Sequence, residues 1–356
     1  MKKNFETYIK NLIEINGPIS IAQFMSEQIN SPKYNYYKKN TEKIGAKGDF
    51  ITSPEISQVF GELIGLWCAN TWWLMNSPKK FNLIELGPGN GTLMKDALRA
   101  LAIVPGFLKY AEIHLVENSS FLQKQQTNKL NSEFKIFWHK DISTIPNHPN
   151  IIISNEFLDT FPIHQYELTH SGWAERYIGL DKNNNFCYIN QHKNKEFLKQ
   201  LKSLPIGSVF EYSPSLNSFF ESLAIKLKLF GGIALFIDYG YEDQINASTI
   251  RAISNHKFVD IFDHMGKTDL SAHVNFGALI SLSKKIGVHN YGVVTQGSFL
   301  KKLGIRHRVD KLLETNPKYK EDIINANLKL TNKNEMGEIF KVLAISEKPL
   351  DNLPGF

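Results

Sequence analysis

The chain has 356 residues, of which 42% are hydrophobic and 21% are charged, and this is typical of a soluble globular protein with room for two domains. The formal net charge of +6 is too small for a surface that coats nucleic acid, so we expect no nucleic-acid partner. The two cysteines, Cys68 and Cys187, form no C-x-x-C pair, which argues against a metal site or a disulfide framework and favours a reducing cytoplasm.

The N-terminal region predicts helices and no targeting segment. The stretch MKKNFETYIKNLIEI has no long apolar core, and no window of the chain reaches the ~18 apolar residues that cross a bilayer, so we expect no membrane span. Residues 4–30 predict two short helices on either side of Gly17-Pro18. After a polar and aromatic loop, Ser53-Pro54 predicts the next helix start, because a hydroxyl caps free N–H groups and proline fits the first turn.

From residue 81 onward, short apolar runs alternate with helical stretches. We expect strands at 81–86, 112–118, 134–139 and 151–154, with helices at 92–103 and 119–130. Apolar strands separated by helices predict a mostly parallel sheet that helices cover on both faces. Beyond residue 160 we expect antiparallel strands in HQYEL, RYIGL and NFCYI, helices at 214–229 and 276–287, a helix-rich stretch at 297–330, and strands at 231–240, 289–296 and 339–346.

Three glycines, Gly87, Gly89 and Gly91, follow the strand 81–86. A glycine-rich turn between the first strand and the first helix of a parallel sheet is a ligand-binding position. The dinucleotide motif G-x-G-x-x-G has its third glycine one residue later, where this chain has Thr92. The spacing therefore favours a different nucleoside ligand over a dinucleotide.

Glu85, two residues before the first glycine, indicates the charge of that ligand. A carboxylate about 6 Å from a pyrophosphate charge costs roughly 3 kcal/mol at an effective dielectric near 20, which is on the order of a hundredfold in affinity. The sign reverses for S-adenosylmethionine, which carries an ammonium and a sulfonium. We therefore predict S-adenosylmethionine as the cofactor, with Glu85 and the three glycines in its binding loop.

Two further acidic positions follow the next two strands. Glu117 ends the strand 112–118, where it is placed to accept both ribose hydroxyls, although a dinucleotide would require the same contact. Asp141, with Ile142 beside it, follows the third strand and is placed near the adenine amino group. A solvated loop aspartate explains Asp141 equally well.

Asn155, Glu156 and Asp159 follow the fourth strand, and ligands of doubly wound sheets bind beyond the carboxyl ends of the strands. We expect these groups beside the reactive methyl, where the protein aligns a nucleophile with the departing sulfur. Two carboxylates suit arginine, whose guanidinium is always charged and forks onto carboxylates. Glu156 is the predicted polarising residue and Asp159 the second clamp, unless Asp159 only caps the turn before Pro162 and Glu156 contacts only cofactor.

Other polar positions stay open between a functional and a structural role. Residues 47–55, including Thr52 and Pro54, either fold over the cofactor or only shape a loop. Asp238 ends a strand and is expected at the pocket rim. His273, in DLSAHVNF, is predicted to line the substrate channel as a catalytic residue, although a lone histidine is more often structural.

The stretches GDFITSPEISQVFGELIGLW, LIELGPGNGTL, HLVENS, SNEFLDTFP, IDYG and DLSAHVNFGAL together resemble the MidA-like methyltransferases. This family includes the mitochondrial assembly factor of respiratory complex I that methylates an arginine on a core subunit. The similarity runs from about residue 17 to the last strand. It implies a Rossmann-like methyltransferase core, S-adenosylmethionine as methyl donor, and a protein arginine, with a complex I subunit as one candidate partner.

Position by position, the resemblance places Glu117 at the ribose and Asn155 and Glu156 beside the methyl. It also implies a cofactor loop with Glu85, Gly87, Gly89 and Gly91, and an N-terminal loop from Gly48 to Glu55 in which Gly48, Thr52 and Pro54 contact the cofactor. Where family members commonly read HVDF, this chain has Asn275, which keeps the hydrogen-bonding shape and loses the charge. If that position helps to hold a cationic substrate, the substitution weakens the case for arginine.

The expected α/β fold has three parts. Residues 1–78 form a helical N-terminal extension with a cofactor-covering loop, residues 79–160 and 231–350 form the methyltransferase core with a helical insertion at about 297–330, and residues 161–230 form an inserted substrate-binding region. The Asn-, Lys- and Ile-rich composition and the lack of a transit peptide favour a bacterial cytoplasmic protein. A homodimer is a further arrangement that we consider.

Two alternatives to a protein methyltransferase stay open. A nucleic-acid or small-molecule methyltransferase is the first, although amino-methylating DNA enzymes carry a proline pair where this chain reads Asn155-Glu156-Phe157. The second is an assembly chaperone with a retained cofactor pocket, against which the intact glycines and Glu85 argue.

Overall fold

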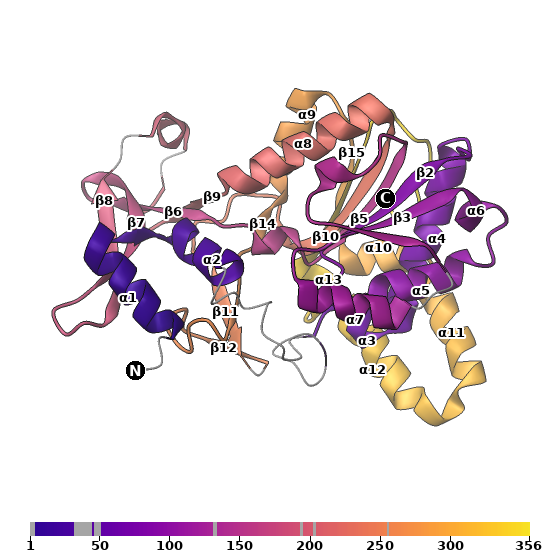
Figure 1. The fold of residues 1–356 in the computed structure, drawn as a ribbon, viewed down its shortest axis with the longest axis horizontal. Coiled ribbons are helices and arrows are strands. Elements are labelled where there is room, and N and C mark those ends of the chain that lie inside the picture. The colour runs from indigo at the N-terminus through magenta and orange to yellow at the C-terminus, as the bar shows by residue number, and fades with distance from the viewer. Residues whose placement is uncertain are drawn as a thin grey trace.

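The computed structural model describes residues 4–31, 45, 51–130, 134–192, 195–201, 204–254 and 256–356, and its largest element is a mixed sheet (Figure 1). Seven strands lie in the order β15-β16-β10-β5-β2-β3-β4, and the short β14 pairs with β10. Their bounds are β2 Phe81–Leu86, β3 Ala111–Val116, β4 Ile136–His139, β5 Asn150–Asn155, β10 Gly232–Tyr241, β14 Val274–Asn275, β15 His289–Thr295 and β16 Phe340–Ser346.

Strand direction separates this sheet from that of dinucleotide-binding proteins. The five strands from β10 to β4 run parallel, whereas β16 is antiparallel to both of its neighbours, β10 and β15. A dinucleotide-binding sheet has the all-parallel order 3-2-1-4-5-6, with no antiparallel strand inserted. The predicted doubly wound, mostly parallel sheet is confirmed, and its one reversed strand is the final strand of the chain.

Helices cover both faces of the sheet because the central strands are apolar on both sides. Along β10, Ile233 and Leu235 belong to one hydrophobic core, while Ala234 and Phe236 belong to the other. Helices α4 and α5 pack in the first core, and α8 and α9 pack in the second (Figure 1). The helices around the sheet are α4 Gln58–Leu74, α5 Thr92–Leu101, α6 Phe107–Tyr110, α7 Ser120–Leu130, α8 Pro214–Phe230 and α9 Phe276–Ile286.

A second lobe lies beside the main sheet, around α1 and β8 in Figure 1. Its core joins Phe24, Ile178 and Leu270, which come from three distant parts of the chain. This core therefore crosses the expected boundaries at 78 and 231. The elements of the lobe are α1 Phe5–Asn16, β1 Ile19–Ser20, α2 Ile21–Asn30, β6 His164–Thr169, β7 Gly172–Leu180, β8 Phe186–His192, β9 Val209–Tyr212, β11 Arg251–Ser254, β12 Lys257–Val259 and β13 Asp269–Ser271.

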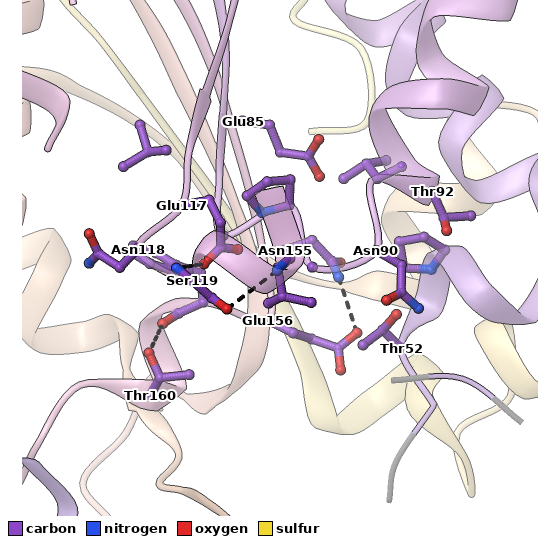
Figure 2. Close-up of a pocket in the computed structure, with 18 of the residues that line it drawn as sticks. Thr52, Glu85, Asn90, Thr92, Glu117, Asn118, Ser119, Asn155, Glu156 and Thr160 are labelled. Carbon is purple, nitrogen blue, oxygen red and sulfur yellow. Dashed lines mark hydrogen bonds between the residues drawn. The ribbon is translucent and has the colours of Figure 1, made fainter. Parts of the chain in front are cut away.

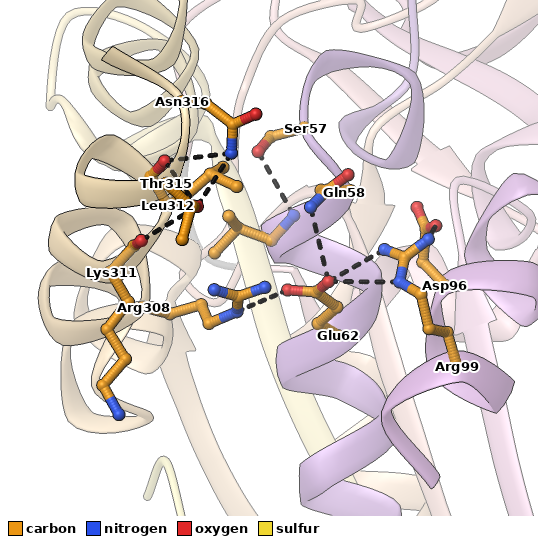
Figure 3. Close-up of polar contacts among 11 residues, drawn as sticks. Ser57, Gln58, Glu62, Asp96, Arg99, Arg308, Lys311, Leu312, Thr315 and Asn316 are labelled. Carbon is orange, nitrogen blue, oxygen red and sulfur yellow. Dashed lines mark hydrogen bonds and ion pairs between the residues drawn. The ribbon is translucent and has the colours of Figure 1, made fainter. Parts of the chain in front are cut away.

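A helical insertion precedes the last strand, as the helix-rich stretch at 297–330 predicts. It consists of α10 Gln296–Lys302, α11 Ile305–Thr315 and α12 Lys320–Thr331, followed by the short α13 Met336–Ile339. Figure 3 shows how α11 is fixed to the sheet core: Arg308 Nε lies 2.6 Å from Glu62 Oε2 on α4, and Arg99 Nη2 lies 2.8 Å from Glu62 Oε1. Glu62 is buried, so the ion pair with Arg308 attaches α11 to α4 at one defined position.

Two expectations about local structure are wrong. The predicted helix from Ser53 is broken: α3 (Ser53–Ile56) ends at Ser57, whose side chain accepts the Val59 N–H and begins α4. Strands β11, β12 and β13 lie in a stretch for which we expected none, because they are only three or four residues long. In the part of the chain that the structure describes, no helix combines the length and apolar character that a bilayer crossing requires.

Candidate active site

A cavity of about 310 Å³ lies where β2, β3 and β5 end (Figure 2). Sheets of this type bind ligands beyond the carboxyl ends of their strands, and small-molecule sites have volumes of about 300–1,000 Å³. Ten of the predicted cofactor-binding residues line it: Thr52, Pro54, Glu85, Gly87, Gly89, Glu117, Asp141, Ile142, Asn155 and Glu156. Residues that are up to about 100 positions apart in the sequence therefore meet in one cavity.

The glycine loop has a backbone that only glycine adopts readily. Gly87, Gly89 and Gly91 have φ angles of 61°, 51° and 75°, all in the left-handed region. A Cβ atom on Gly87 would lie 2.6 Å from Cδ2 of Phe157, so a side chain there collides with the protein wall. Gly91 does not line the cavity, and a Cβ atom there would meet Cγ of Gln126 at 3.4 Å.

The described wall of the cavity is acidic. Its charged residues are one lysine, Lys140, and five carboxylic acids, Glu55, Glu85, Glu117, Asp141 and Glu156. Burial raises the pKa of Glu85 to about 8, while a Met94 N–H opposes this shift and the charge of Glu117 adds to it. Oε2 of Glu85 is buried and accepts no hydrogen bond from any described residue. A cation that donates hydrogen bonds would satisfy this oxygen, whereas an anion would not.

Glu117 is held by its neighbours at the end of β3. Its Oε1 accepts the Ser119 N–H at 2.7 Å, and its Oε2 accepts Nε2 of Gln126 at 3.3 Å. Burial raises the pKa of Glu117 to about 7. The same amide group of Gln126 donates to the Gly89 carbonyl at 2.8 Å, so one side chain joins the glycine loop to Glu117.

Gln126 is not among the residues that the sequence pattern predicts for this site. It lies on α7 between Leu122 and Leu130, and these are the three buried positions of that helix. A glutamine at the middle of a buried i, i+4, i+8 row is a detectable signal, because a buried amide requires partners.

Glu156 lies on a strained turn directly after β5. Its φ is 50°, in the left-handed region that a non-glycine residue adopts at a cost of about 1–2 kcal/mol. Oδ2 of Asp238 stabilises the turn by accepting the N–H groups of Phe157, Leu158 and Asp159 at 3.1, 2.8 and 3.3 Å. Asp238 is therefore buried behind the turn, and the expectation that it lies at the pocket rim is wrong.

Both hydrogen bonds to Glu156 from described residues reach one oxygen. Oε1 accepts the Ser53 N–H and Nδ2 of Asn155, each at 3.0 Å. Burial raises the pKa of Glu156 to about 8, and the charge of Asp238 adds to the shift. The side chain is thus fixed through Oε1 while Oε2 has no hydrogen-bond donor among the described residues.

Residues 52–56 cover one side of the cavity. Besides the Ser53 N–H on Glu156, the Ser53 hydroxyl donates to Oε1 of Gln296 at the start of α10. Oε1 of Glu55 accepts hydrogen bonds from Asn90 and Thr92 of the glycine loop. This segment therefore connects Glu156, the glycine loop and the helical insertion. Gly48, which we expected beside it, lies outside the described residues.

Asp141 and Ile142 line the cavity from the end of β4, with Asp141 exposed and Ile142 buried. Oδ1 of Asp141 accepts the Ser143 N–H at 2.7 Å, and hydrogen bonds from Ser143 lower the pKa of Asp141. Asp141 thus lines the cavity, as a ligand-binding role requires, and also caps a local turn, as a structural loop aspartate does.

Asp159 and His273 do not line this cavity. Asp159 is buried, its Oδ1 accepts no hydrogen bond from a described residue, and burial with the nearby charges of Asp238 and Asp269 raises its pKa well above the usual value. His273 lines a neighbouring cavity of about 80 Å³, and burial lowers its pKa to about 4. Their catalytic roles therefore stay predictions. Asn275 caps α9 by accepting the Ala278 N–H, a contact that an aspartate would make as well.

The cavity fits S-adenosylmethionine on grounds of charge and hydrogen bonding. Its acidic wall and the unsatisfied oxygen of Glu85 suit an ammonium and a sulfonium, and Glu117 is positioned beside the glycine loop as a ribose acceptor requires. Pyrophosphate would meet five carboxyl groups and one lysine. Sheet order, glycine loop and acidic wall together define a Rossmann-like, S-adenosylmethionine-dependent methyltransferase.

The chain belongs to a family described as putative S-adenosyl-L-methionine-dependent methyltransferases, whose sequence profile matches residues 63–294. It is 34% identical to the Caenorhabditis elegans "Protein arginine methyltransferase NDUFAF7 homolog, mitochondrial", covering 98% of this chain and 87% of that protein. It is 32% identical to the Homo sapiens protein arginine methyltransferase NDUFAF7, covering 94% of this chain and 81% of that protein. The predicted family and the predicted cofactor are confirmed.

The fold matches that of a superfamily member from Burkholderia thailandensis, which was crystallised bound to S-adenosyl-homocysteine. The TM-score is 0.88 at 24% sequence identity, covering 98% of this chain and 93% of that chain. At this identity the likeness establishes the fold, which therefore includes the second lobe as well as the methyltransferase sheet.

Proposed function

We propose that this enzyme transfers the methyl group of S-adenosylmethionine to an arginine side chain of a protein. The observation that carries the proposal is Glu156, a carboxyl group in the cavity wall that is fixed through Oε1. Its Oε2 has no donor among the described residues and would accept an N–H of a guanidinium, a charged donor that pairs well with carboxylates. The names of the relatives, which are protein arginine methyltransferases, support the same acceptor.

We assign the cofactor to the acidic cavity, where it supplies an electrophilic methyl group on a sulfonium. Glu85 would hold its ammonium, the loop with Gly87, Gly89 and Gly91 would allow close approach, and Glu117 would accept hydrogen bonds from the ribose hydroxyls. Asp141 and Ile142 would contact the adenine, while Thr52 and Pro54 would cover the site, a role that the family resemblance also implies for Gly48. These assignments agree with the cavity lining for every one of these residues except Gly48 and Gly91.

Methylation of a charged guanidinium releases one proton, because the product is again a cation. The nitrogen–carbon bond forms, the carbon–sulfur bond breaks with its electron pair on sulfur, and one N–H proton leaves. Glu156 is the residue that we assign to accept this proton, since burial raises its pKa to about 8, within the range of a useful general base at neutral pH. Asp159 acts in this proposal as a second clamp and His273 as a residue of the substrate channel.

Methyl labelling tests the acceptor. The purified enzyme and S-adenosylmethionine with an isotopically labelled methyl group are incubated with a lysate of the source organism, and the modified residue is mapped by mass spectrometry. We expect label on an arginine, and a loss of about a hundredfold or more with Glu156→Gln. Glu221→Gln, an exposed carboxylate on α8, is the matched control and should keep full activity. Label on lysine, nucleic acid or a metabolite would contradict the proposal.

The finer biological context is also a proposal. The family resemblance points to a respiratory complex I subunit as the acceptor and to a role in complex I assembly, and the composition favours a bacterial cytoplasm. Half-exposed Trp73 on α4 offers an apolar surface for a homodimer. Mapping the labelled protein tests the acceptor, and fractionation of the source cells tests the cytoplasmic location. Sedimentation velocity with Trp73→Glu tests the homodimer.

A further inference from the structure

A second cavity lies in the helical insertion, away from the acidic active site. A groove of about 480 Å³ runs between α11 and α12, which form the lower right corner of the molecule in Figure 1. Its floor is apolar, with Ile305, Val309, Leu313 and Ile324. Methyl transfer uses none of these residues.

The groove has a basic rim. Its charged lining residues are Lys301, Arg306 and Asp310, all three exposed, so two basic residues outweigh one acidic residue. The segment 296–331 contains eight Lys or Arg residues and four Asp or Glu residues, a net charge of +4 in a chain whose total is +6. Seven of the eight basic residues are exposed and form no ion pair with a described residue: Lys301, Lys302, Arg306, Lys311, Lys318, Lys320 and Lys329. The eighth, Arg308, is the residue that pairs with Glu62.

The groove also contains an unsatisfied polar atom. Asn327 lines the groove, and its Oδ1 is buried and accepts no hydrogen bond from a described residue. A buried amide oxygen without a donor is costly, so a donor from an occupant would stabilise it. Two apolar side chains nearby are exposed: Tyr319, with 61% of its surface accessible, and Leu328, with 47%. Exposed aromatic and aliphatic side chains beside a pocket are typical of protein-binding surfaces.

We propose that the groove between α11 and α12 binds a short segment of a partner protein that presents an apolar side chain flanked by carboxylates. The apolar side chain fills the floor, the carboxylates meet Lys301 and Arg306, and a backbone N–H donates to Asn327. A protein fits better than nucleic acid, because the floor is apolar and four acidic residues are interspersed among the basic ones.

The groove is attached to the active site by two described contacts. Arg308 on α11 pairs with Glu62 on α4. Gln296, at the start of α10, accepts a hydrogen bond from the Ser53 hydroxyl, and the backbone N–H of Ser53 donates to Glu156. Gln296 and Ser53 therefore connect the helical insertion to Glu156, while Arg308 connects it to α4.

Selection of displayed peptides on the full-length enzyme, saturated with S-adenosylhomocysteine, tests the proposal. We expect random dodecamers to be enriched in sequences with an aliphatic or aromatic residue beside Asp or Glu. Fluorescence polarisation of the selected peptides should then show a loss of about tenfold in affinity with Lys301→Glu/Arg306→Glu, and a comparable loss with Ile324→Ala. Both variants leave the active-site residues intact, and thermal melting checks that they fold.

Lys124→Glu/Lys182→Glu is the matched control, because it changes the net charge equally at two exposed lysines outside the insertion. Its affinity should equal that of the wild type. Equal weakening in the control would mean general charge attraction and would overturn the proposal, as would selection without acidic and apolar residues. Competition by a short DNA duplex with higher affinity than any selected peptide would assign the surface to nucleic acid. A dimer that dissociates only in Lys301→Glu/Arg306→Glu would assign it to a second copy of the chain.

Discussion

At the residue scale, Glu85 is a carboxyl group that is already buried in the ligand-free protein. Glu85 has 2% of its surface accessible, and its pKa is raised to about 8. A bound cation favours the carboxylate, so binding lowers this pKa and releases a proton. Affinity for S-adenosylmethionine should therefore rise with pH as Glu85 ionises in the free enzyme.

We predict that the association constant increases roughly tenfold between about pH 6 and 7.5, a range in which the ligand's amino group stays largely protonated. Glu85→Gln should bind about tenfold more weakly at pH 7.5 and should lose most of the pH dependence, because the amide cannot ionise. Isothermal titration calorimetry in buffers of different ionisation enthalpy measures both the affinity and the released proton. An unchanged pH profile in Glu85→Gln would exclude this residue as the partner of the cation.

The backbone at Glu156 makes a second prediction. Since its φ of 50° favours glycine, Glu156→Gly should have a free energy of unfolding about 1 kcal/mol higher than Glu156→Ala. Both variants lose the carboxylate, so the comparison isolates the backbone, and both should lose methyl transfer. Urea unfolding measures the difference. If the alanine variant were as stable as the glycine variant, the turn would not be strained.

The residues that face the cavity could be predicted from their positions at the ends of strands. The residues that fix those side chains and turns in place could not. Glu85, Glu117 and Glu156 each follow a strand, and topology places the ends of parallel strands together. Gln126 and Asp238 were missed in their actual roles, because each acts on a backbone or side chain that is distant in sequence. Such contacts depend on tertiary packing, which local patterns do not encode.

At the element scale, the attachment of α11 to α4 carries a measurable energy. Glu62 is buried between Arg99 and Arg308, so we predict a coupling free energy of about 1–3 kcal/mol between Glu62 and Arg308. A double-mutant cycle of Glu62→Gln and Arg308→Met, followed by urea unfolding, measures it. Arg306→Met, an exposed arginine on the same helix, is the control and should show no coupling to Glu62. Additive effects of Glu62→Gln and Arg308→Met would mean that packing alone holds the insertion.

Long elements with a clear period were predicted, and short ones were not. The strand 81–86 and the helix that stops at Gly287 agree with the structure because their apolar patterns extend over whole elements. The break at Ser57 was missed, since the apolar row of α4 begins in the residues before it. Strands β11 to β13 owe their conformation to pairing within the second lobe.

At the scale of the whole molecule, the buried carboxyl groups couple stability to pH. Folded-state pKa values of about 8, 7 and 8 for Glu85, Glu117 and Glu156 lie above the ordinary value of 4.5. The stability that these groups contribute is therefore present below about pH 4.5 and is lost as the pH rises through about 7 to 8.

We predict that the melting temperature of the ligand-free enzyme falls between about pH 6 and 8.5, and that saturating S-adenosylmethionine opposes this fall, because a bound cation stabilises the ionised carboxylates. Differential scanning calorimetry with and without the ligand measures both curves. The triple variant Glu85→Gln/Glu117→Gln/Glu156→Gln should have a flatter profile than the wild type. A melting temperature of the wild type that rises through this range would contradict the assigned pKa directions.

The most direct test is a crystal structure of the enzyme with S-adenosylhomocysteine, whose amino group and ribose report on two carboxylates at once. We predict that the amino group lies within hydrogen-bonding distance of Glu85 and the ribose hydroxyls within hydrogen-bonding distance of Glu117, above the loop from Gly87 to Gly91. A ligand bound outside this cavity, or bound inside it with the adenine against Glu85, would contradict the account.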